Sequence, residues 1–114
     1  GNPTMQLPTP PSLVEEKALS NQRYAMIEKQ ITIINKLGLH ARAAAKLVAT
    51  ASGYQSEIYI QKEGQRVNGK SIMGVMMLAA GKESVITLQA QGVDDMAALD
   101  ALEALINDRF CEAE

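Results

Sequence analysis

The chain has 114 residues, of which 46% are hydrophobic and 21% charged, and its formal net charge is −2. This length allows one domain around a single modest core and leaves no room for two. With one cysteine, Cys111, and one histidine, His40, the sequence excludes an internal disulfide and a clustered zinc site, and we expect no metal and no other cofactor. The cysteine usage favours a cytoplasmic setting, and no apolar run reaches the roughly 20 residues that a membrane span needs.

The first 25 residues differ in character from the rest. Prolines occur at positions 3, 8, 10 and 11, where the chain cannot join a helix or a central strand. Ser12 is suited to cap a short helical turn over 13–20. We therefore expect a mostly disordered extension over 1–25 and a folded domain over 26–114.

The hydrophobic periodicity of this domain predicts its strands and helices. Strands are indicated where apolar and polar residues alternate, and helices where apolar residues recur every three or four positions. Glycines and capping residues mark the ends of these segments. The expected elements are a strand over 30–34, a helix over 41–52, strands over 57–62 and 65–67, a short helix over 72–80, a strand over 85–90, and a last helix with Asp94 as its cap.

Each predicted helix has an apolar stripe that must be covered. The last helix presents a stripe made of Leu99, Leu102, Leu105, Ile106 and Phe110. The most economical packing is an α+β open-faced sandwich of order βαββαβα, in which a four-stranded, mainly antiparallel sheet carries three helices on one face. The other face is then wet, which agrees with the polar residues at Thr32, Thr87 and Gln89.

His40 lies directly before the helix predicted over 41–52, in the run Gly38-Leu39-His40-Ala41-Arg42. A helix N-terminus offers unpaired backbone N–H groups and a partial positive charge, which stabilise an anion. The same positive end disfavours imidazolium and keeps the ring neutral and nucleophilic near pH 7. Arg42 can offer a planar, permanently charged fork to phosphoryl oxygens. The pattern favours a reversible phosphoryl carrier over a histidine that only caps the helix or lies on a solvated turn.

The segment 72–80 is apolar almost all round. Such a helix is either wholly buried or exposes an apolar patch, and complete burial is not expected in so small a domain. We expect Val75 and Met77 to point inward, and Ile72 and Met73 to point outward, where adaptable methionine side chains suit contacts with several partners. The alternative is a helix that only fills gaps in the core.

Charge is distributed unevenly along the chain. Seven basic and two acidic residues lie between positions 36 and 82, whereas eight acidic residues and one arginine lie between positions 83 and 114. The region around His40 should therefore attract acidic or phosphorylated partners. Nucleic acid is not expected, because aromatic residues are few. The expected docking surface combines Ile72, Met73 and Met76 with the basic residues Lys46 and Lys70.

Two motifs carry a resemblance to a known family. The run Gly38-Leu39-His40-Ala41-Arg42 is followed, after about 30 residues, by Gly69-Lys70-Ser71-Ile72-Met73-Gly74. Each motif is short, but their order and spacing in a domain of this size resemble the HPr family. Its members are the histidine-containing phosphocarriers of the phosphoenolpyruvate-dependent sugar phosphotransferase system. The resemblance spans about residues 26–112.

The resemblance implies the same open-faced fold and a carrier rather than an enzyme. It implies that His40 accepts a phosphoryl group from phospho-enzyme I through Nδ1 and passes it to the EIIA domains of sugar permeases, with Arg42 assisting. Ser71 matches the serine that an HPr kinase/phosphorylase modifies in part of the family. We expect a monomer with no direct membrane insertion.

Two features leave alternatives open. Ala43 stands where the family usually has proline, and it adds a backbone N–H in the first helical turn. The run Asn35-Lys36-Leu37-Gly38 resembles the nitrogen-regulatory relatives of the family, so a nitrogen-regulatory phosphorelay is one alternative to sugar transport. A rival from another class is a small-molecule-binding regulatory domain of similar strand–helix order, although such a domain has no use for His40 and Arg42 at a helix N-terminus.

Overall fold

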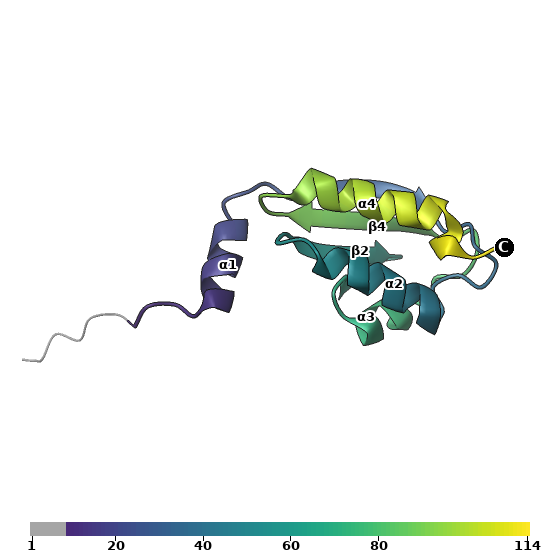
Figure 1. Ribbon diagram of the computed structural model, residues 1–114, viewed down its shortest axis with the longest axis horizontal. Coiled ribbons are helices and arrows are strands. Elements are labelled where there is room, and N and C mark those ends of the chain that lie inside the picture. Colours follow the sequence, from purple (N-terminus) through teal and green to yellow (C-terminus); the bar gives the residue numbers. More distant parts are fainter. Residues whose placement is uncertain (1–8) are drawn as a thin grey trace, which may run out of the picture.

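The centre of the molecule is a four-stranded antiparallel sheet, seen in a computed structural model that describes residues 9–114 (Figure 1). Its strands are β1 (Ile27–Thr32), β2 (Glu57–Lys62), β3 (Gln65–Asn68) and β4 (Val85–Gln91). They lie in the order β1-β4-β2-β3, and every neighbouring pair is antiparallel. The helices are α1 (Leu13–Asn21), α2 (Ala41–Ser52), α3 (Ile72–Met77) and α4 (Asp95–Asn107), followed by the 3-10 turn η1 (Arg109–Cys111).

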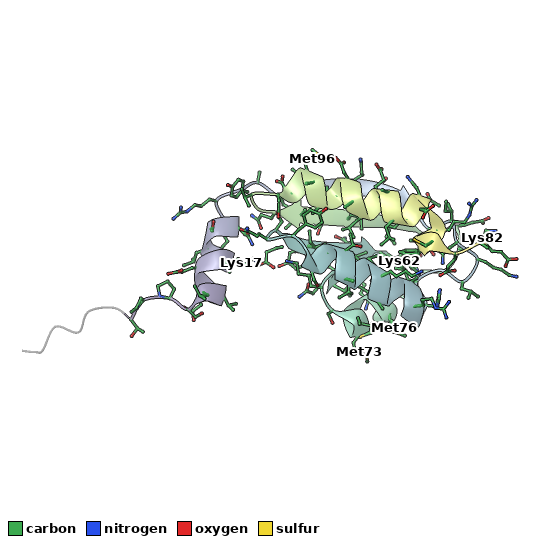
Figure 2. The ribbon with its side chains drawn as sticks, viewed as in Figure 1. Lys17, Lys62, Met73, Met76, Lys82 and Met96 are labelled. Atoms are coloured by element: carbon green, nitrogen blue, oxygen red, sulfur yellow. The ribbon has the colours of Figure 1, made fainter. Side chains whose placement is uncertain are left out.

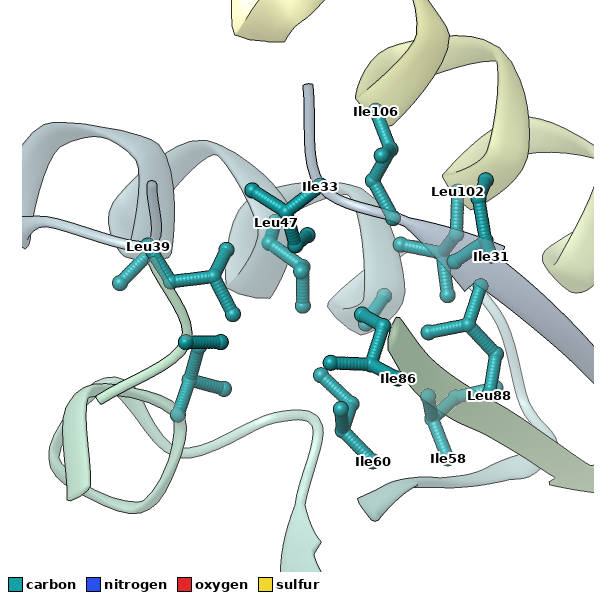
Figure 3. Packing of buried hydrophobic residues seen from close by; sticks show 14 of the residues in the cluster. Ile31, Ile33, Leu39, Leu47, Ile58, Ile60, Ile86, Leu88, Leu102 and Ile106 are labelled. Carbon is teal, nitrogen blue, oxygen red and sulfur yellow. The ribbon is translucent and has the colours of Figure 1, made fainter. Parts of the chain in front are cut away.

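One face of the sheet forms the hydrophobic core. Alternate residues of β2 and β4 are fully buried, and they meet the apolar stripes of α2 and α4 (Figure 3). On the opposite face Thr32 is exposed, and Thr87 and Gln89 are half-buried. The predicted α+β open-faced sandwich is therefore confirmed. The fully buried side chains that fill the core include Ile33, Leu47, Ile58, Ile60, Val75, Ile86, Leu88, Leu102, Ile106 and Phe110.

The first strand begins earlier than the sequence pattern predicts. It was expected over 30–34, but β1 starts at Ile27, which pairs with Ala90 of β4. Ile33 leaves the ladder yet stays fully buried, with its backbone N–H donating to the carbonyl of Ser84 at 2.9 Å. Ile33 and Ile34 are apolar although they lie beyond the last paired residue of β1. Hydrophobic periodicity alone therefore did not locate the end of the strand.

Helix α3 is shorter than predicted. It ends at Met77 instead of continuing to residue 80, because Ala79 adopts a left-handed conformation with φ of 49°. Val75 is fully buried as expected, but the prediction that Met77 points inward is wrong, since its side chain is 66% exposed. Leu78, three positions after Val75, takes the inward position instead.

The last helix also ends earlier than its apolar stripe. Helix α4 stops at Asn107, and Phe110 reaches the core through the turn η1, where it is fully buried. Leu105 packs against the core but is only partly buried. Asp94 precedes the helix as predicted, but its carboxylate does not cap it; it accepts hydrogen bonds from the β2 side of the molecule.

The N-terminal segment contains the helix that its capping serine predicts. Ser12 accepts a hydrogen bond from the N–H of Glu15 at 3.1 Å, and α1 follows. Its last residue, Asn21, is 3% exposed and donates to the carbonyl of Gln55 at 3.0 Å. We expected residues 1–25 to be mostly disordered. Residues 1–8 of this extension lie outside the described residues. Within residues 9–114, no helix is long and apolar enough to cross a membrane.

Candidate functional site

The backbone before α2 places His40 at the N-terminus of that helix. His40 is the N-cap residue, with extended backbone angles, and its carbonyl accepts the first helical hydrogen bond, from the N–H of Ala44 at 2.8 Å. Its side chain makes no capping hydrogen bond. The alternative that the imidazole serves as a helix cap is therefore wrong, and the ring nitrogens are not used by the backbone of α2.

The loop that leads to His40 is held firmly against the rest of the domain. Gly38 has a φ of 63°, and a side chain there would overlap the carbonyl of Ala80, so only glycine fits. Leu39 is 5% exposed and donates its N–H to the same carbonyl at 2.8 Å. The side-chain amide of Asn35, buried beneath the loop, donates to the carbonyl of Gly38 at 2.8 Å. The imidazole is thus presented from a fixed backbone.

The imidazole meets a carboxylate from the far end of the chain. His40 Nε2 lies 2.6 Å from Glu112 Oε1, and the two side chains are 27% and 16% exposed. The hydrogen bond with His40 lowers the pKa of the Glu112 carboxyl below its ordinary value; burial opposes this, and a hydrogen bond from Asn35 and the positive charge of Lys46 add to the lowering. Glu112 is therefore an ionised acceptor at neutral pH.

Arg42 and Lys46 occupy different environments on α2. Arg42 is exposed, and its side chain makes no hydrogen bond or ion pair with residues 9–114. It lies two positions after His40, in the first turn of the helix. Lys46 is half-buried and donates from Nζ to the carbonyl of Phe110 at 2.5 Å. Of the two cations, Arg42 is the one whose charged group is available to an incoming anion.

Ser71, which belongs to the second sequence motif, is the N-cap residue of α3. Its Oγ accepts a hydrogen bond from the N–H of Gly74 at 3.1 Å, and the side chain is half-buried. The neighbouring Lys70 donates from Nζ to the carbonyl of Tyr54 at 2.8 Å. Burial lowers the pKa of the Lys70 ammonium, and the positive charge of Lys17 lowers it further.

Helix α3 exposes the apolar patch that its composition predicts. Ile72, Met73 and Met76 are 43%, 72% and 39% exposed, and Figure 2 shows Met73 and Met76 pointing away from the body of the domain. Helix α3 packs against α2, the helix that begins beside His40. Met77, expected inside, adds its exposed side chain to the apolar surface.

Glu112 is the site residue that the sequence pattern did not indicate. It is separated from His40 by 72 positions, and it lies in an acidic tail with no motif around it. Only the fold, through η1, brings it to the imidazole. Throughout residues 9–114 no group of three or more histidine, cysteine, aspartate or glutamate side chains is arranged to hold a metal ion.

Comparisons with known proteins agree on one family. The family profile described as "PTS HPr component phosphorylation site" matches residues 27–108. The phosphocarrier protein HPr of Cupriavidus necator is 54% identical over 89 residues, which cover 78% of this chain and 100% of that protein. The phosphocarrier protein HPr of Neisseria meningitidis serogroup A is 55% identical, with the same coverage.

A solved structure agrees as well. HPr-C-His from Thermoanaerobacter tengcongensis superposes with a TM-score of 0.75 at 45% sequence identity, and the match covers 77% of this chain and 99% of that one. Sequence and fold thus identify the same relatives, and the matched segment contains the His40 and Ser71 motifs. The chain belongs to the HPr family of phosphocarrier proteins of the phosphotransferase system.

Proposed function

We propose that His40 accepts a phosphoryl group from phospho-enzyme I and passes it to EIIA-type domains. The observation that carries this proposal is the placement of a single imidazole at the N-terminus of α2, partly exposed and not used to cap the helix. Within the described part of the chain only Nε2 of the ring is hydrogen-bonded, so Nδ1 is left to act as the nucleophile. Membership of the HPr family decides against the rival small-molecule-binding domain.

The surroundings of His40 suit a phosphoryl group bound to Nδ1. The first N–H groups of α2 and the positive end of the helix dipole stabilise an anion held there. The exposed guanidinium of Arg42, two positions along the helix, offers paired N–H donors to the phosphoryl oxygens. Because this environment stabilises both the bound phosphoryl and the transition state, it supports transfer in either direction.

Partner proteins dock, in this proposal, on α3 and its surroundings. Ile72, Met73 and Met76 supply the exposed apolar centre that a protein interface needs. Lys46 and Lys70 lie on the same side of the sheet but donate hydrogen bonds to backbone carbonyls, so their part in docking is to supply positive charge. Acidic surfaces on enzyme I and on EIIA-type domains fit this combination.

Ser71 is the proposed regulatory site. It lies at the N-terminus of α3, and its neighbours Ile72 and Met73 belong to the exposed apolar patch. A phosphoryl group there adds a charge of about −1.5 to −2 at pH 7. A hydrated dianion beside an apolar docking surface opposes association with an acidic partner. An HPr kinase/phosphorylase is the enzyme we propose for this modification.

The proposed carrier acts as a cytoplasmic monomer. The EIIA domains of sugar permeases are the preferred acceptors, because the relatives identified above carry the name phosphocarrier protein HPr. A nitrogen-regulatory relay remains the alternative, supported by the run Asn35-Lys36-Leu37-Gly38. Transfer assays with EIIA domains from both branches separate the two, since the cognate acceptor takes the phosphoryl group faster.

The experiment that tests the proposal is incubation with enzyme I and phosphoenolpyruvate, followed by mass measurement. We expect the full chain to gain one phosphoryl group that is lost in acid and kept in alkali, as for a phosphoramidate. His40→Ala should gain none, because His40 is the only histidine of the sequence. Acid-labile phosphate on the His40→Ala variant would overturn the proposal.

A further inference from the structure

We propose that Glu112 is a positioning residue that fixes the proton of the His40 imidazole on Nε2 and so directs phosphorylation to Nδ1. The proposal rests on the proposed phosphoryl-carrier function and deepens it. The observation behind it is the 2.6 Å contact between His40 Nε2 and Glu112 Oε1, two half-buried side chains. Neither of the two sequence motifs contains Glu112, and the match to the family profile ends at residue 108.

The turn before Glu112 directs its carboxylate toward the His40 imidazole. Arg109, Phe110 and Cys111 all have positive φ, at 54°, 54° and 63°. Three consecutive left-handed residues other than glycine are unfavourable, and they persist only where the surroundings hold them. Here Phe110 is fully buried in the core, and its carbonyl accepts a hydrogen bond from Lys46 Nζ at 2.5 Å. The turn is therefore anchored on α2, the helix that carries His40.

Residues after Glu112 add a second anchor. The backbone N–H of Lys36 donates to the carbonyl of Glu114 at 3.0 Å, and Lys36 Nζ forms an ion pair with the Glu114 carboxylate at 3.2 Å. Lys36 belongs to the loop that leads to His40. Glu112 is thus held from both sides, by the core through Phe110 and by the His40 loop through Glu114, and its position over the imidazole is well determined.

The contact decides which ring nitrogen carries the proton. An ionised carboxylate only accepts hydrogen bonds, so His40 Nε2 must be the donor. In the neutral imidazole the other nitrogen, Nδ1, then holds the free electron pair. The Nε2 and Nδ1 atoms are separated by Cε1, and the Nε2–H bond and the Nδ1 electron pair point in diverging directions, so the carboxylate at Nε2 does not block an incoming phosphoryl group.

The same carboxylate balances charge during transfer. The Nδ1 electron pair forms a bond to phosphorus as the bond from phosphorus to the donor atom of phospho-enzyme I breaks, and that bond's electron pair stays with the donor. The proton on Nε2 does not move, so the His40 ring gains positive charge. Glu112 stabilises this charge through a charge-assisted hydrogen bond. In the reverse direction, the ring leaves phosphorus as a neutral imidazole with its proton still on Nε2.

The direct test is the imidazole N–H proton of the full chain, observed by NMR in protein with ¹⁵N-labelled histidine. We expect an Nε2–H signal protected from exchange with water in the unmodified protein. Glu112→Ala should lose this protection, whereas Glu112→Gln should keep part of it, because the amide oxygen can still accept. Asp100→Ala is the matched control: it removes an exposed carboxylate that pairs with Lys29 rather than His40, and it should leave the signal unchanged.

A kinetic measurement with enzyme I completes the test. Glu112→Ala should slow phosphorylation roughly tenfold, the lower end of the loss found when the partner that orients a ligating histidine is removed. The loss should appear in kcat with KM little changed, because the docking residues on α3 are untouched. Glu112→Gln should also be slow, since it keeps the hydrogen bond but not the charge, and Asp100→Ala should match the unmodified chain.

The outcomes separate this proposal from the one on which it rests. If the chain is phosphorylated on His40 but the Nε2–H signal is absent, or survives in Glu112→Ala, the role of Glu112 is overturned and the carrier function stands. If the signal depends on Glu112 but no variant takes up phosphoryl from enzyme I, the carrier function fails, and the role of Glu112 in transfer fails with it.

Discussion

The two nitrogens of the His40 ring have different surroundings, and the proposed chemistry depends on that difference. Nε2 contacts Glu112, while no hydrogen bond to Nδ1 occurs in the described part of the chain. The backbone N–H groups of α2 begin directly after His40, and Arg42 extends from its first turn. One side of the ring is therefore held by the protein, and the other is available to a phosphoryl group.

The Arg42→Lys variant tests the guanidinium at the scale of one residue. The change keeps the positive charge but removes the planar fork that pairs with phosphoryl oxygens. We expect transfer to and from His40 to slow roughly tenfold, which corresponds to about 1.4 kcal/mol in the transition state. The free energy of unfolding should change by less than about 0.5 kcal/mol, because Arg42 is exposed. Single-turnover kinetics in both directions and urea unfolding measure the two effects; unchanged transfer rates would show that the fork has no special role.

Sequence reasoning could propose His40, Arg42 and Ser71 as site residues because the pattern around each is local. A histidine directly before a helix, an arginine two residues on and a serine at a helix start are visible in a short window. Glu112 was missed because its contact with His40 depends on the path of the whole tail through η1. A left-handed turn of three residues that are not glycine has no signature in the sequence.

Helix α3 combines capping with proposed docking and proposed regulation in a six-residue element. Its N-cap hydroxyl stabilises the first turn, its buried Val75 attaches it to the core, and its remaining apolar side chains face outward. The composition predicted an exposed apolar patch and the serine cap. It did not predict the end at Met77, because the left-handed Ala79 that turns Leu78 and Ala80 into the core is not a glycine.

Substitutions of Ser71 separate its capping role from its regulatory role. Ser71→Ala should lower the free energy of unfolding by about 1 kcal/mol, because the hydrogen bond to Gly74 is lost. Ser71→Asp should unfold at nearly the same temperature as the unmodified chain, since aspartate caps a helix as well as serine does. It should slow phosphorylation of His40 by enzyme I by roughly tenfold, equivalent to about 1.4 kcal/mol of weaker docking. Thermal melts and initial rates decide the matter: an unaltered rate in Ser71→Asp defeats the regulatory role.

At the scale of the whole molecule, contacts between distant segments meet just before β2. The carboxylate of Asp94, before α4, accepts hydrogen bonds from the N–H groups of Gln55 and Ser56 at 2.8 and 2.9 Å and from the Ser56 hydroxyl at 2.5 Å. Asn21, at the end of α1, donates to the carbonyl of the same Gln55. The start of β2 is thus where α1 and α4 meet the sheet. Periodicity predicted the helices and strands but not this junction. Asp94 precedes α4, but its side chain accepts hydrogen bonds from the residues before β2.

The Asp94 junction makes part of the stability dependent on pH. Burial raises the pKa of the Asp94 carboxyl, but the hydrogen bonds from Ser56 and Gln55 outweigh it, and the pKa lies below its ordinary value of 3.8. A carboxyl whose pKa is lowered by folding stabilises the protein above its unfolded pKa, and this contribution is lost as the pH falls through the folded pKa. Glu112 contributes to stability with the same pH dependence, because its hydrogen bond with His40 lowers the pKa of its carboxyl.

The Asp94→Asn variant measures this contribution. At pH 7 the free energy of unfolding should fall by about 1–3 kcal/mol, because an amide cannot accept all of the hydrogen bonds that the carboxylate accepts. The difference from the unmodified chain should be smaller at about pH 2.5 than at pH 7, because the native carboxyl takes up a proton as the pH falls through its folded pKa. Asp108→Asn, at an exposed position, is the matched control and should change stability little. Urea unfolding at both pH values checks the prediction; an equal difference at both would show that ionisation of Asp94 is not the cause.

The most direct test of the central claim is whether the phosphoryl group leaves His40 for a second protein. The chain is phosphorylated with enzyme I and labelled phosphoenolpyruvate, purified from both, and mixed with an EIIA-type domain. We predict that the label moves from this chain to the EIIA domain, and that unlabelled chain is recovered ready to be phosphorylated again. Label that stays on the chain, or that leaves it only as free phosphate, would contradict the account, because His40 would then be modified without acting as a carrier.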